Sequence, residues 1–264
     1  MFERVVRDGV AMHVVPSLFA ESGIGVAFSE RSGGVSIDPY TSLDLASHVG
    51  DDPGAVDINR GRLLSALGIA PLRDRLTTAG QIHGTASCEV TLANAGSGSF
   101  AHGDRLPLAD TDALWTRTPG VPLLLLYADC VPVILARPSV PAVAVVHAGW
   151  RGAAGGIVGT AARALAELPG EEDLTAFIGA HIGQCCYEVG PECVSHFDNA
   201  FVTITAATPR LDLGAAVAQD LKRSGVPKER QWHLGICTAH NTDRFYSYRS
   251  EGRTGRHGAL AVIL

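Results

Sequence analysis

Two histidines and one cysteine, all good ligands for first-row transition metals, stand at the ends of apolar or strand-like runs. His83 ends "AGQIHG", Cys130 ends "LLLLYADC" and His147 ends "AVAVVH". Each run predicts a strand that gives way to a turn, where the sheet holds a side chain rigidly and the turn exposes it. Two imidazoles and one thiolate suit Zn²⁺ and also Cu²⁺, and three protein ligands leave a fourth position for water or substrate. We therefore expect a catalytic metal site at these three residues.

The chemistry of this trio has more than one interpretation. A bound Zn²⁺ lowers the pKa of its water to about 7, which provides hydroxide at neutral pH. Without a metal, Cys130 is a candidate nucleophile with a nearby histidine as its base. A single histidine or cysteine at a strand end is also often a hydrogen-bonded structural group or a buried apolar one. Spacing alone leaves all three interpretations open.

The stretch "VVHAGWRGAAGG" suggests a binding surface beside His147. The chain is expected to turn through Gly149 and to enter a helix near Ala153. Backbone N–H groups at a helix start favour an anion, Arg151 adds a bidentate donor, and Trp150 offers a flat face for a ring. The alternative is that the indole packs in the core and the guanidinium pairs with an acid.

Two other polar segments contain candidate binding residues. Residues 29–53 include Arg31 and Asp44, in a turn-rich stretch where capping and turns explain most Asp and Ser residues. Residues 237–258 carry several tyrosines and arginines, which form a possible anion-binding or ring-binding edge. We expect the second segment to be structural rather than catalytic.

The cysteines do not have the spacing of a disulfide framework, and the chain has no CxxC pair, so a structural zinc finger is not expected. Cys185 and Cys186 are adjacent in residues 181–190. Neighbouring residues of a strand point to opposite faces, so at most one of the two is expected to enter a given site.

Predicted strands alternate with predicted helices along the chain. The expected strands are residues 23–30, 76–84, 122–130, 142–150, 174–182, 232–238 and 257–264. The expected helices are residues 54–68, with Asp51 or Asp52 as N-cap and Pro53 in the first turn, 153–170 and 213–225. This alternation predicts a layered α/β domain, and residues 90–105 are read as a loop inside it. We expect a single domain over residues 1–264.

Composition narrows the classes of partner. The chain has 264 residues and a net charge of −6 without a basic block, so nucleic acid is not expected as a partner. The run from Val10 to Ala20 is broken by His13 and Pro16, unlike a signal peptide. Apolar runs fall short of the roughly 18–20 residues that span a bilayer. We expect a cytoplasmic protein without membrane association, and a monomer.

Several motifs occur in an order that resembles one known family. They are "SGGVS", "YTSLDLASHVGDDP", "GQIHG", "YADCVPVIL", "VVHAGWRG", "IGQCCYEVG" and "FYSYRSEGRTGR". From about Phe28 to its end, the chain resembles the laccase-domain family, also called the multicopper polyphenol oxidase-like or purine nucleoside phosphorylase family. The resemblance implies a single α/β domain of α-β-β-α type, with mixed sheets flanked by helices.

The resemblance also implies an activity and a set of site residues. The metal ligands and catalytic residues would be His83, Cys130 and His147. The reactions would be phosphorolysis of adenosine, inosine and methylthioadenosine, and deamination of adenosine to inosine, with purine nucleosides and phosphate as partners. We assign substrate binding to Arg31, Asp44, Gln81, Asp129, Trp150 and Arg151.

The sequence departs from the family pattern at three positions. Asp44 stands where the family usually has Asn, and an added carboxylate in the pocket would oppose phosphate. Gln184 replaces a usual Pro. Tyr127 replaces a small or hydroxyl residue, where it either narrows the pocket or fills the core.

Other functions remain as alternatives. A laccase reaction needs several coppers, and a single N/S/N site does not readily pass four electrons to oxygen, although a copper-dependent phenol oxidase stays an alternative. A metal-free Cys-His hydrolase, or an amide hydrolase that edits cell-wall precursors, would use the same Cys130 and histidines. A non-catalytic nucleotide-binding protein would hold its ligand there without turnover.

Overall fold

The computed structural model describes residues 1–171, 173–205 and 208–264. The strands are β1 (Glu3–Arg7), β2 (Val10–Val14), β3 (Ile24–Ser29), β4 (Ser87–Glu89), β5 (Ala113–Thr116), β6 (Leu123–Tyr127), β7 (Val131–Arg137), β8 (Ala142–Ala148), β9 (Thr175–Ile178), β10 (Val202–Thr205), β11 (Thr208–Leu211), β12 (Gln231–His233) and β13 (His257–Ile263). The α-helices are α1 (Pro16–Ser22), α2 (Pro53–Ala66), α3 (Trp150–Ala154), α4 (Ile157–Ala166), α5 (Pro191–Val194), α6 (Leu213–Arg223) and α7 (Tyr248–Glu251). The 3₁₀ helices are η1 (Ala70–Arg75), η2 (Asn199–Phe201), η3 (Lys228–Arg230) and η4 (Thr238–His240).

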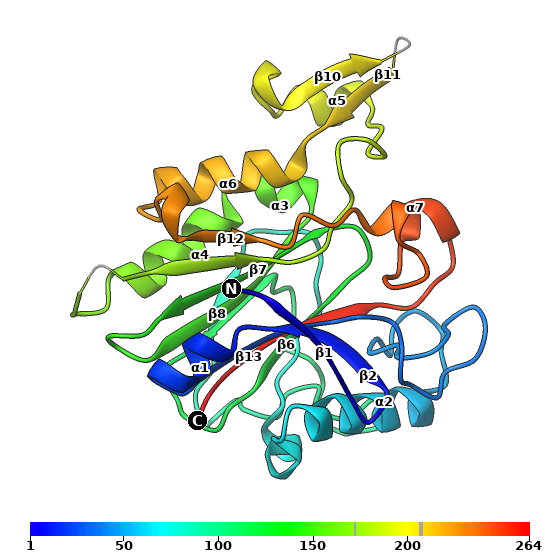
Figure 1. The fold of residues 1–264 in the computed structure, drawn as a ribbon, viewed down its shortest axis with the longest axis vertical. Helices are drawn as coiled ribbons and strands as arrows, with labels where there is room; N and C mark the ends of the chain where they lie inside the picture. Colours follow the sequence, from blue (N-terminus) through cyan, green and yellow to red (C-terminus); the bar gives the residue numbers. More distant parts are fainter. Residues whose placement is uncertain (172, 206–207) are drawn as a thin grey trace.

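Two sheets form the centre of the molecule, one with antiparallel ladders throughout and one mixed (Figure 1). One has five strands in the order β1-β2-β3-β13-β6, and the other has six in the order β12-β9-β7-β8-β5-β4. Strands β10 and β11 form a separate two-stranded sheet that projects at one end. In the five-stranded sheet, β13 lies between β3 and β6 and pairs antiparallel with both. The strand that ends the described chain is therefore an inner strand.

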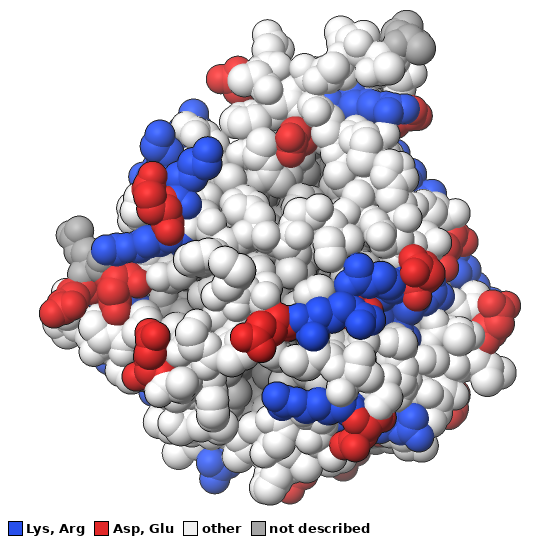
Figure 2. Space-filling model, viewed as in Figure 1, with Lys and Arg blue, Asp and Glu red and all other residues white. Residues whose placement is uncertain are grey.

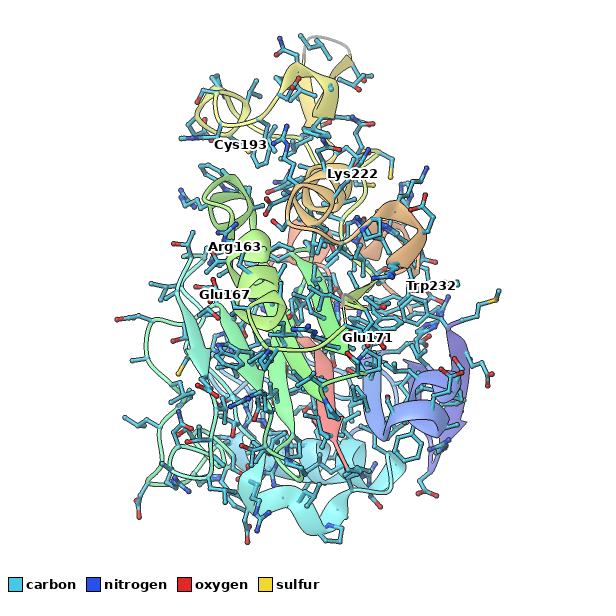
Figure 3. All side chains as sticks on the ribbon, turned by 90° about the vertical axis from the view of Figure 1, so that its left-hand side faces the viewer. Arg163, Glu167, Glu171, Cys193, Lys222 and Trp232 are labelled. Atoms are coloured by element: carbon cyan, nitrogen blue, oxygen red, sulfur yellow. The ribbon has the colours of Figure 1, made fainter. Side chains whose placement is uncertain are left out.

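The sheets pack face to face, and helices cover both outer faces. Helices α4 and α6 contact each other and pack on the outer face of the six-stranded sheet. Figure 3 shows this layer from the side, with Arg163 on α4, Glu167 at the C-cap of that helix and Lys222 on α6. Helix α2 covers the outer face of the five-stranded sheet at the other end of the stack. This order of layers confirms the predicted α-β-β-α class.

Strand β6 shows why its sequence is apolar without alternation. Its odd-numbered residues, such as Leu125 and Tyr127, belong to the core between the two sheets. Its even-numbered residues, Leu124 and Leu126, belong to the core beneath α2. Both faces of the strand are buried, so both side-chain sets must be apolar.

The boundaries of the predicted helices are partly confirmed. Helix α2 begins as expected, with the Asp52 carboxylate accepting from the backbone N of Ala55, and Gly68 follows its end with a left-handed φ of 74°. The prediction of a single helix over 153–170 is wrong. The chain instead forms α3 and α4 with a break at Gly156, whose φ is 79°. Helix α3 begins at Trp150 of the "HAGWRG" motif, earlier than the expected start near Ala153.

Some short segments differ from their predicted state. Residues 76–84 form isolated bridges at Thr77 and Ala79 rather than a continuous strand. In the predicted strand 174–182, the ladder ends at Ile178, and the residues around Cys185 form a turn. The hairpin of β1 and β2 was not predicted, because its polar and apolar residues do not stand out from their surroundings.

The described helices include none that is long and apolar enough to cross a bilayer. On the face shown in Figure 2, basic side chains gather in a band to the right of centre, with acidic side chains among and around them. Over the whole chain, acidic residues outnumber basic ones and give the net charge of −6.

Buried Glu30 fastens the N-terminal hairpin to the body of the molecule. Its carboxylate accepts from Arg4 of β1 at 2.8 Å and from Nε of Arg244 at 3.1 Å, and it lies 3.0 Å from the ring of His13 of β2. Burial by itself raises the pKa of Glu30, but the hydrogen bonds from these three partners outweigh it and hold the pKa well below its ordinary value. The ionised form is therefore the one that the fold stabilises.

We predict that Glu30→Gln lowers the free energy of unfolding at neutral pH by roughly 1–3 kcal/mol, because it removes the buried carboxylate charge that accepts from the guanidinium groups of Arg4 and Arg244. Since the folded pKa of Glu30 is lowered, its contribution is complete above the ordinary value of 4.5 and declines as the pH falls below it. The difference between the variant and the wild type should therefore narrow in acid, as measured by urea unfolding across pH. Exposed Glu3→Gln is the matched control, and an equal effect of both variants would contradict the prediction.

Candidate metal centre and its cavity

The structure brings His83, Cys130 and His147 together. One ligand atom from each lies within 4.8 Å of the others, and the two imidazole rings meet edge to face with centroids 4.8 Å apart. His147 is buried, Cys130 is half-buried and His83 is exposed, so the group is closed on one side and open on the other. Nitrogen and sulfur donors with an open side fit a zinc or copper ion.

The Cys130 thiol stands in the turn between β6 and β7, and its neighbour Asp129 anchors that turn. One carboxylate oxygen of Asp129 accepts from Oγ1 of Thr238 at 2.6 Å, and the other accepts from the backbone N of Arg249 at 2.7 Å. Asp129 has a φ of 89°, a left-handed conformation that Asp tolerates better than most residues. These bonds fix the direction in which the next side chain leaves the turn.

Both histidines are oriented by Asp112, which is fully buried immediately before β5. Its Oδ1 lies 2.8 Å from Nδ1 of His147 and also accepts from the backbone N of His83 at 3.0 Å. Its Oδ2 accepts from the backbone N of Gly84 at 2.7 Å. A carboxylate on Nδ1 directs the proton there and leaves Nε2 of His147 for a ligand, as in carboxylate–histidine–metal arrangements. Asp112 was not among the residues expected from the sequence.

The charges in the trio favour ionised ligands. Burial opposes a thiolate at Cys130, but His147 and His83 outweigh it and lower the pKa of the thiol to about 6. Burial likewise lowers the pKa of His147, but the Cys130 thiolate and Asp112 outweigh it and raise the value to about 9. The pair is therefore stabilised as thiolate and imidazolium. A metal ion at the same place would replace the imidazolium proton as the positive partner of the thiolate.

The glycines of "HAGWRG" permit the close approach of α3 to the His83 loop. A Cβ at position 149 would lie 2.5 Å from Cδ2 of His83 and 3.3 Å from Sγ of Cys130. A Cβ at position 152 would lie 2.7 Å from the backbone oxygen of Gly84. Only glycine fits these two places without moving a metal ligand or its loop.

A cavity of about 470 Å³ opens beside the trio, a volume typical of small-molecule sites. Its wall consists of His48, Gln81, His83, Leu126, Ala128, Asp129, Cys130, His147, Trp150, Arg151, Ile182, Tyr187, Tyr248, Arg249 and Arg256. Three arginines each lie over an aromatic ring of the same wall. The pairs are Arg151 over Trp150 at 4.3 Å, Arg249 over Tyr187 at 5.2 Å and Arg256 over Tyr248 at 5.9 Å from guanidinium carbon to ring centroid.

Four of the substrate-binding residues expected from the sequence line this cavity. They are Gln81, Asp129, Trp150 and Arg151. The amide of Gln81 pairs with the backbone N and O of Leu126 at 2.9 and 2.8 Å, so it extends the hydrogen bonding of β6 like a strand residue. The Arg151 guanidinium stacks on its neighbouring indole, and the indole itself is only half-buried, so both remain at the cavity wall.

The other two, Arg31 and Asp44, stand outside the cavity wall. Arg31 donates to the backbone oxygen of Thr41 and to the Glu251 carboxylate and lies over a tyrosine ring. Asp44 accepts from the backbone N of Arg256 at 2.7 Å, so it touches the cavity through that arginine. Burial raises the pKa of Asp44 to about 7 in spite of its backbone hydrogen bonds, so the carboxyl is not fully charged at neutral pH.

The remaining family departures lie in the scaffold. Tyr127 is fully buried and its hydroxyl donates to the backbone oxygen of Val146 at 2.9 Å, which fills the core beside His147 rather than narrowing the cavity. The amide of Gln184 donates to Oγ1 of Thr203 at 2.9 Å, which ties the turn after β9 to β10.

Several cavity residues were not singled out from the sequence as binding residues. His48 belongs to the turn-rich segment 29–53, and Tyr187 follows the adjacent cysteines. The segment 237–258, expected to be structural, supplies Tyr248, Arg249 and Arg256 to the wall. The "FYSYRSEGRTGR" motif could have indicated these wall residues, because its arginines and aromatic residues alternate with small ones.

The sequence of this chain is similar to known proteins over most of its length. The family model described as multi-copper polyphenol oxidoreductase laccase matches residues 25–264. A Streptomyces coelicolor protein named purine nucleoside phosphorylase is 39% identical over 240 residues, covering 89% of this chain and 93% of that protein. A Pseudomonas aeruginosa protein of the same name is 35% identical over 256 residues, covering 95% and 98%.

Solved structures agree with the fold. The crystal structure of YlmD from Geobacillus stearothermophilus superimposes with a TM-score of 0.89 at 32% identity, covering 99% of this chain and 98% of that one. A Bacillus licheniformis hypothetical protein, YfiH, gives a TM-score of 0.90 at 28% identity, covering 100% and 99%. The whole layered arrangement is therefore shared with these proteins.

We predict that Asp112→Asn lowers the zinc affinity of the trio roughly 10- to 100-fold, because the variant loses the charge that orients His147. Competition of the metal-free protein with a chelating indicator measures this affinity. Asp110→Asn, an exposed position two residues away, is the control and should leave the affinity unchanged. Unaltered zinc binding by the Asp112 variant would remove this carboxylate from the site.

We predict that Gly149→Ala also weakens zinc binding, because its methyl group would displace the His83 ring, and that overpacking costs roughly 1–3 kcal/mol of stability. The control is Gly61→Ala in α2, where a Cβ meets nothing within 4 Å. That control should bind zinc normally and gain roughly 0.5–1 kcal/mol in unfolding free energy. Equal zinc affinities of both variants would disprove the close-approach argument.

Proposed function

This chain belongs to the family described as multi-copper polyphenol oxidoreductase laccase, and from that premise we propose that it is a metal-dependent purine nucleoside enzyme. Its proposed reaction is phosphorolysis of adenosine, inosine and methylthioadenosine, with deamination of adenosine to inosine as a second reaction of the same site. The relatives named purine nucleoside phosphorylase support this choice. The observation that carries it is the cavity, which combines the trio with three stacked arginines.

The arginine–aromatic pairs provide complementary binding groups for the two substrates. Trp150, Tyr187 and Tyr248 offer ring faces on which a purine can stack. The guanidinium groups supply fork-shaped donors that match phosphate oxygens. Because each guanidinium is already stacked, it loses little conformational freedom when phosphate binds. The base and the anion thus find their partners in one wall.

Phosphorolysis requires a phosphate oxygen to bond to C1′ of the ribose while the bond from C1′ to the purine nitrogen breaks. The purine leaves with the bonding electron pair and gains a proton. His48 lines the cavity, and burial and the nearby Arg256 lower its pKa, so its ring is neutral at neutral pH and presents both a donor and an acceptor. We assign His48 and Asp129 to positioning the nucleoside, and Arg151 to positioning the phosphate.

The residues His83, Cys130 and His147 would hold the metal, with Zn²⁺ proposed and Cu²⁺ as the alternative. Such an ion would supply Lewis-acid chemistry to the substrate. With a metal on Nε2 of His147, Asp112 would hold the remaining ring proton on Nδ1, away from the cavity. Tyr127 and the buried strands behind the trio exclude water from that side.

A metal-free hydrolase is the second candidate, and one specific observation favours it. Lowering the pKa of Cys130 to about 6 makes the thiolate available at neutral pH beside a protonated His147. This pairing is that of a cysteine nucleophile with its acid–base partner. An amide hydrolase acting on cell-wall precursors would use the same pair.

Incubation of the zinc-loaded chain with adenosine, with and without phosphate, tests the proposal. We expect adenine and ribose 1-phosphate only when phosphate is present, and inosine in both samples if deamination also occurs. His83→Ala should abolish the products. Full turnover by a metal-free His83→Ala chain would overturn the metal-dependent proposal and support the cysteine hydrolase. Absence of any product despite nucleoside binding would support a binding protein, and oxidation of phenols by the copper-loaded chain would support a laccase.

Arg151→Gln refines the same experiment. We expect its KM for phosphate to rise roughly 10- to 100-fold, because one charge-assisted pair is lost. Arg163→Gln, on the exposed side of α4 (Figure 3), is the matched control and should keep the wild-type KM. An unchanged KM in the Arg151 variant would remove this arginine from phosphate binding.

A further inference from the structure

A second cluster of metal-binding side chains lies outside the trio. Cys185 and Cys186 come from the turn between β9 and α5, and Cys237 and His240 come from η4 and its N-cap, between β12 and α7. One ligand atom from each of these four residues lies within 4.8 Å of the other three. The adjacent cysteines are in a turn rather than a strand, so both sulfurs reach the same place, contrary to the expectation from the sequence.

The separations within this cluster fit a tetrahedral ion. In a tetrahedral site, zinc–sulfur bonds of about 2.3 Å and zinc–nitrogen bonds of about 2.0 Å place two sulfurs about 3.8 Å apart, and sulfur and nitrogen about 3.5 Å apart. Sγ of Cys185 lies 3.7 Å from Nδ1 of His240, and the whole set stays within 4.8 Å. The ligands would need to move only a few tenths of an ångström to about one ångström to share one ion.

The backbone around the cluster is shaped for close sulfurs. Residues His181 and Cys237 form a parallel bridge that joins the two segments. The backbone N of Gly183 donates to Sγ of Cys237 at 3.2 Å, a bond that stabilises a thiolate. A Cβ at position 183 would lie 3.1 Å from Sγ of Cys185 and 3.5 Å from Sγ of Cys237, so glycine leaves room for both sulfurs.

We propose that Cys185, Cys186, Cys237 and His240 form a second metal site, structural in kind, that takes Zn²⁺. Three thiolates and one imidazole complete a tetrahedron without an open position, and this donor set is typical of structural zinc sites. The trio, by contrast, has three ligands and an open side. The two sites share no residue, so each site can bind its own zinc ion.

This second ion would connect two segments that build the cavity wall. The first segment continues into Tyr187, and the second contains Thr238, which donates to the Asp129 carboxylate beside Cys130. Loading the cluster therefore stiffens the wall without touching the substrate. Its residues are positioning residues, and Cys185 and His240 are exposed, which gives the ion a path from solvent.

Zinc titration of the reduced, metal-free full chain tests the proposal. We expect the wild type to bind two zinc ions, counted by native mass spectrometry. Cys237→Ser and His83→Ala should each bind one, and the double variant should bind none. Cys88→Ser is the control for loss of a thiol outside both sites, and it should still bind two. A Cys237→Ser chain that binds as many ions as the wild type would overturn the proposal, whereas a His83→Ala chain that binds as many as the wild type would count against the trio instead.

Two further measurements separate the metal site from misfolding and from thiol oxidation. His240→Asn changes an exposed side chain and should keep the wild-type circular dichroism while losing one ion. Cobalt bound to the His83→Ala chain should show thiolate-to-cobalt charge-transfer absorption that Cys186→Ser weakens. If the cobalt spectrum of that chain shows no thiolate bands, or if the reduced cluster binds no ion and only forms a disulfide in air, the metal site is disproved.

Discussion

The carboxylate of Asp112 is the interaction on which the candidate site depends. It is fully buried, and a buried charge is stable only with several partners, which here are the ring of His147 and the backbone N–H groups of the His83 loop. One side chain therefore sets both the tautomer of one histidine and the place of the other. The left-handed His83, with a φ of 62°, is held by these same backbone bonds. The two histidines, from segments far apart in the chain, converge because one acid joins them.

The layers of the fold could be predicted because burial leaves a plain pattern in the sequence. The uninterrupted apolar residues of β6 and β8 and the caps of α2 indicate strands and a helix directly. The break at Gly156 and the turn at Cys185 could not be predicted this way, because they depend on contacts with distant segments. The hairpin of β1 and β2 is stabilised largely by pairing with β3 and by Glu30, and neither partner is visible in its own residues.

The sequence singled out the three residues that the structure brings together and four residues of the cavity wall, but not the acid that orients the histidines. His83, Cys130 and His147 stand out because metal ligands at strand ends are chemically distinctive. Asp112 looks like an ordinary acid before a strand, and its role depends on the His83 loop and the end of β8 meeting at its carboxylate. Arg249 and Arg256 are likewise positioned by acids from distant segments, because their backbone N–H groups donate to Asp129 and Asp44. These hydrogen bonds from the arginine backbones to the two acids fix the cavity wall. The order of residues in the sequence does not show such pairings.

The position of β13 inside the five-stranded sheet has a consequence for how the chain matures on the ribosome. Strand β6, which leads into the Cys130 turn, has β13 as its ladder partner in that sheet, and residues 257–263 are synthesised long after it. A nascent chain that lacks them leaves β6 without this ladder, although Thr77 and Gln81 still contact the strand. Assembly of the trio therefore benefits from the synthesis of residues 257–263, and partly made chains that lack them are poorly suited to capture an ion.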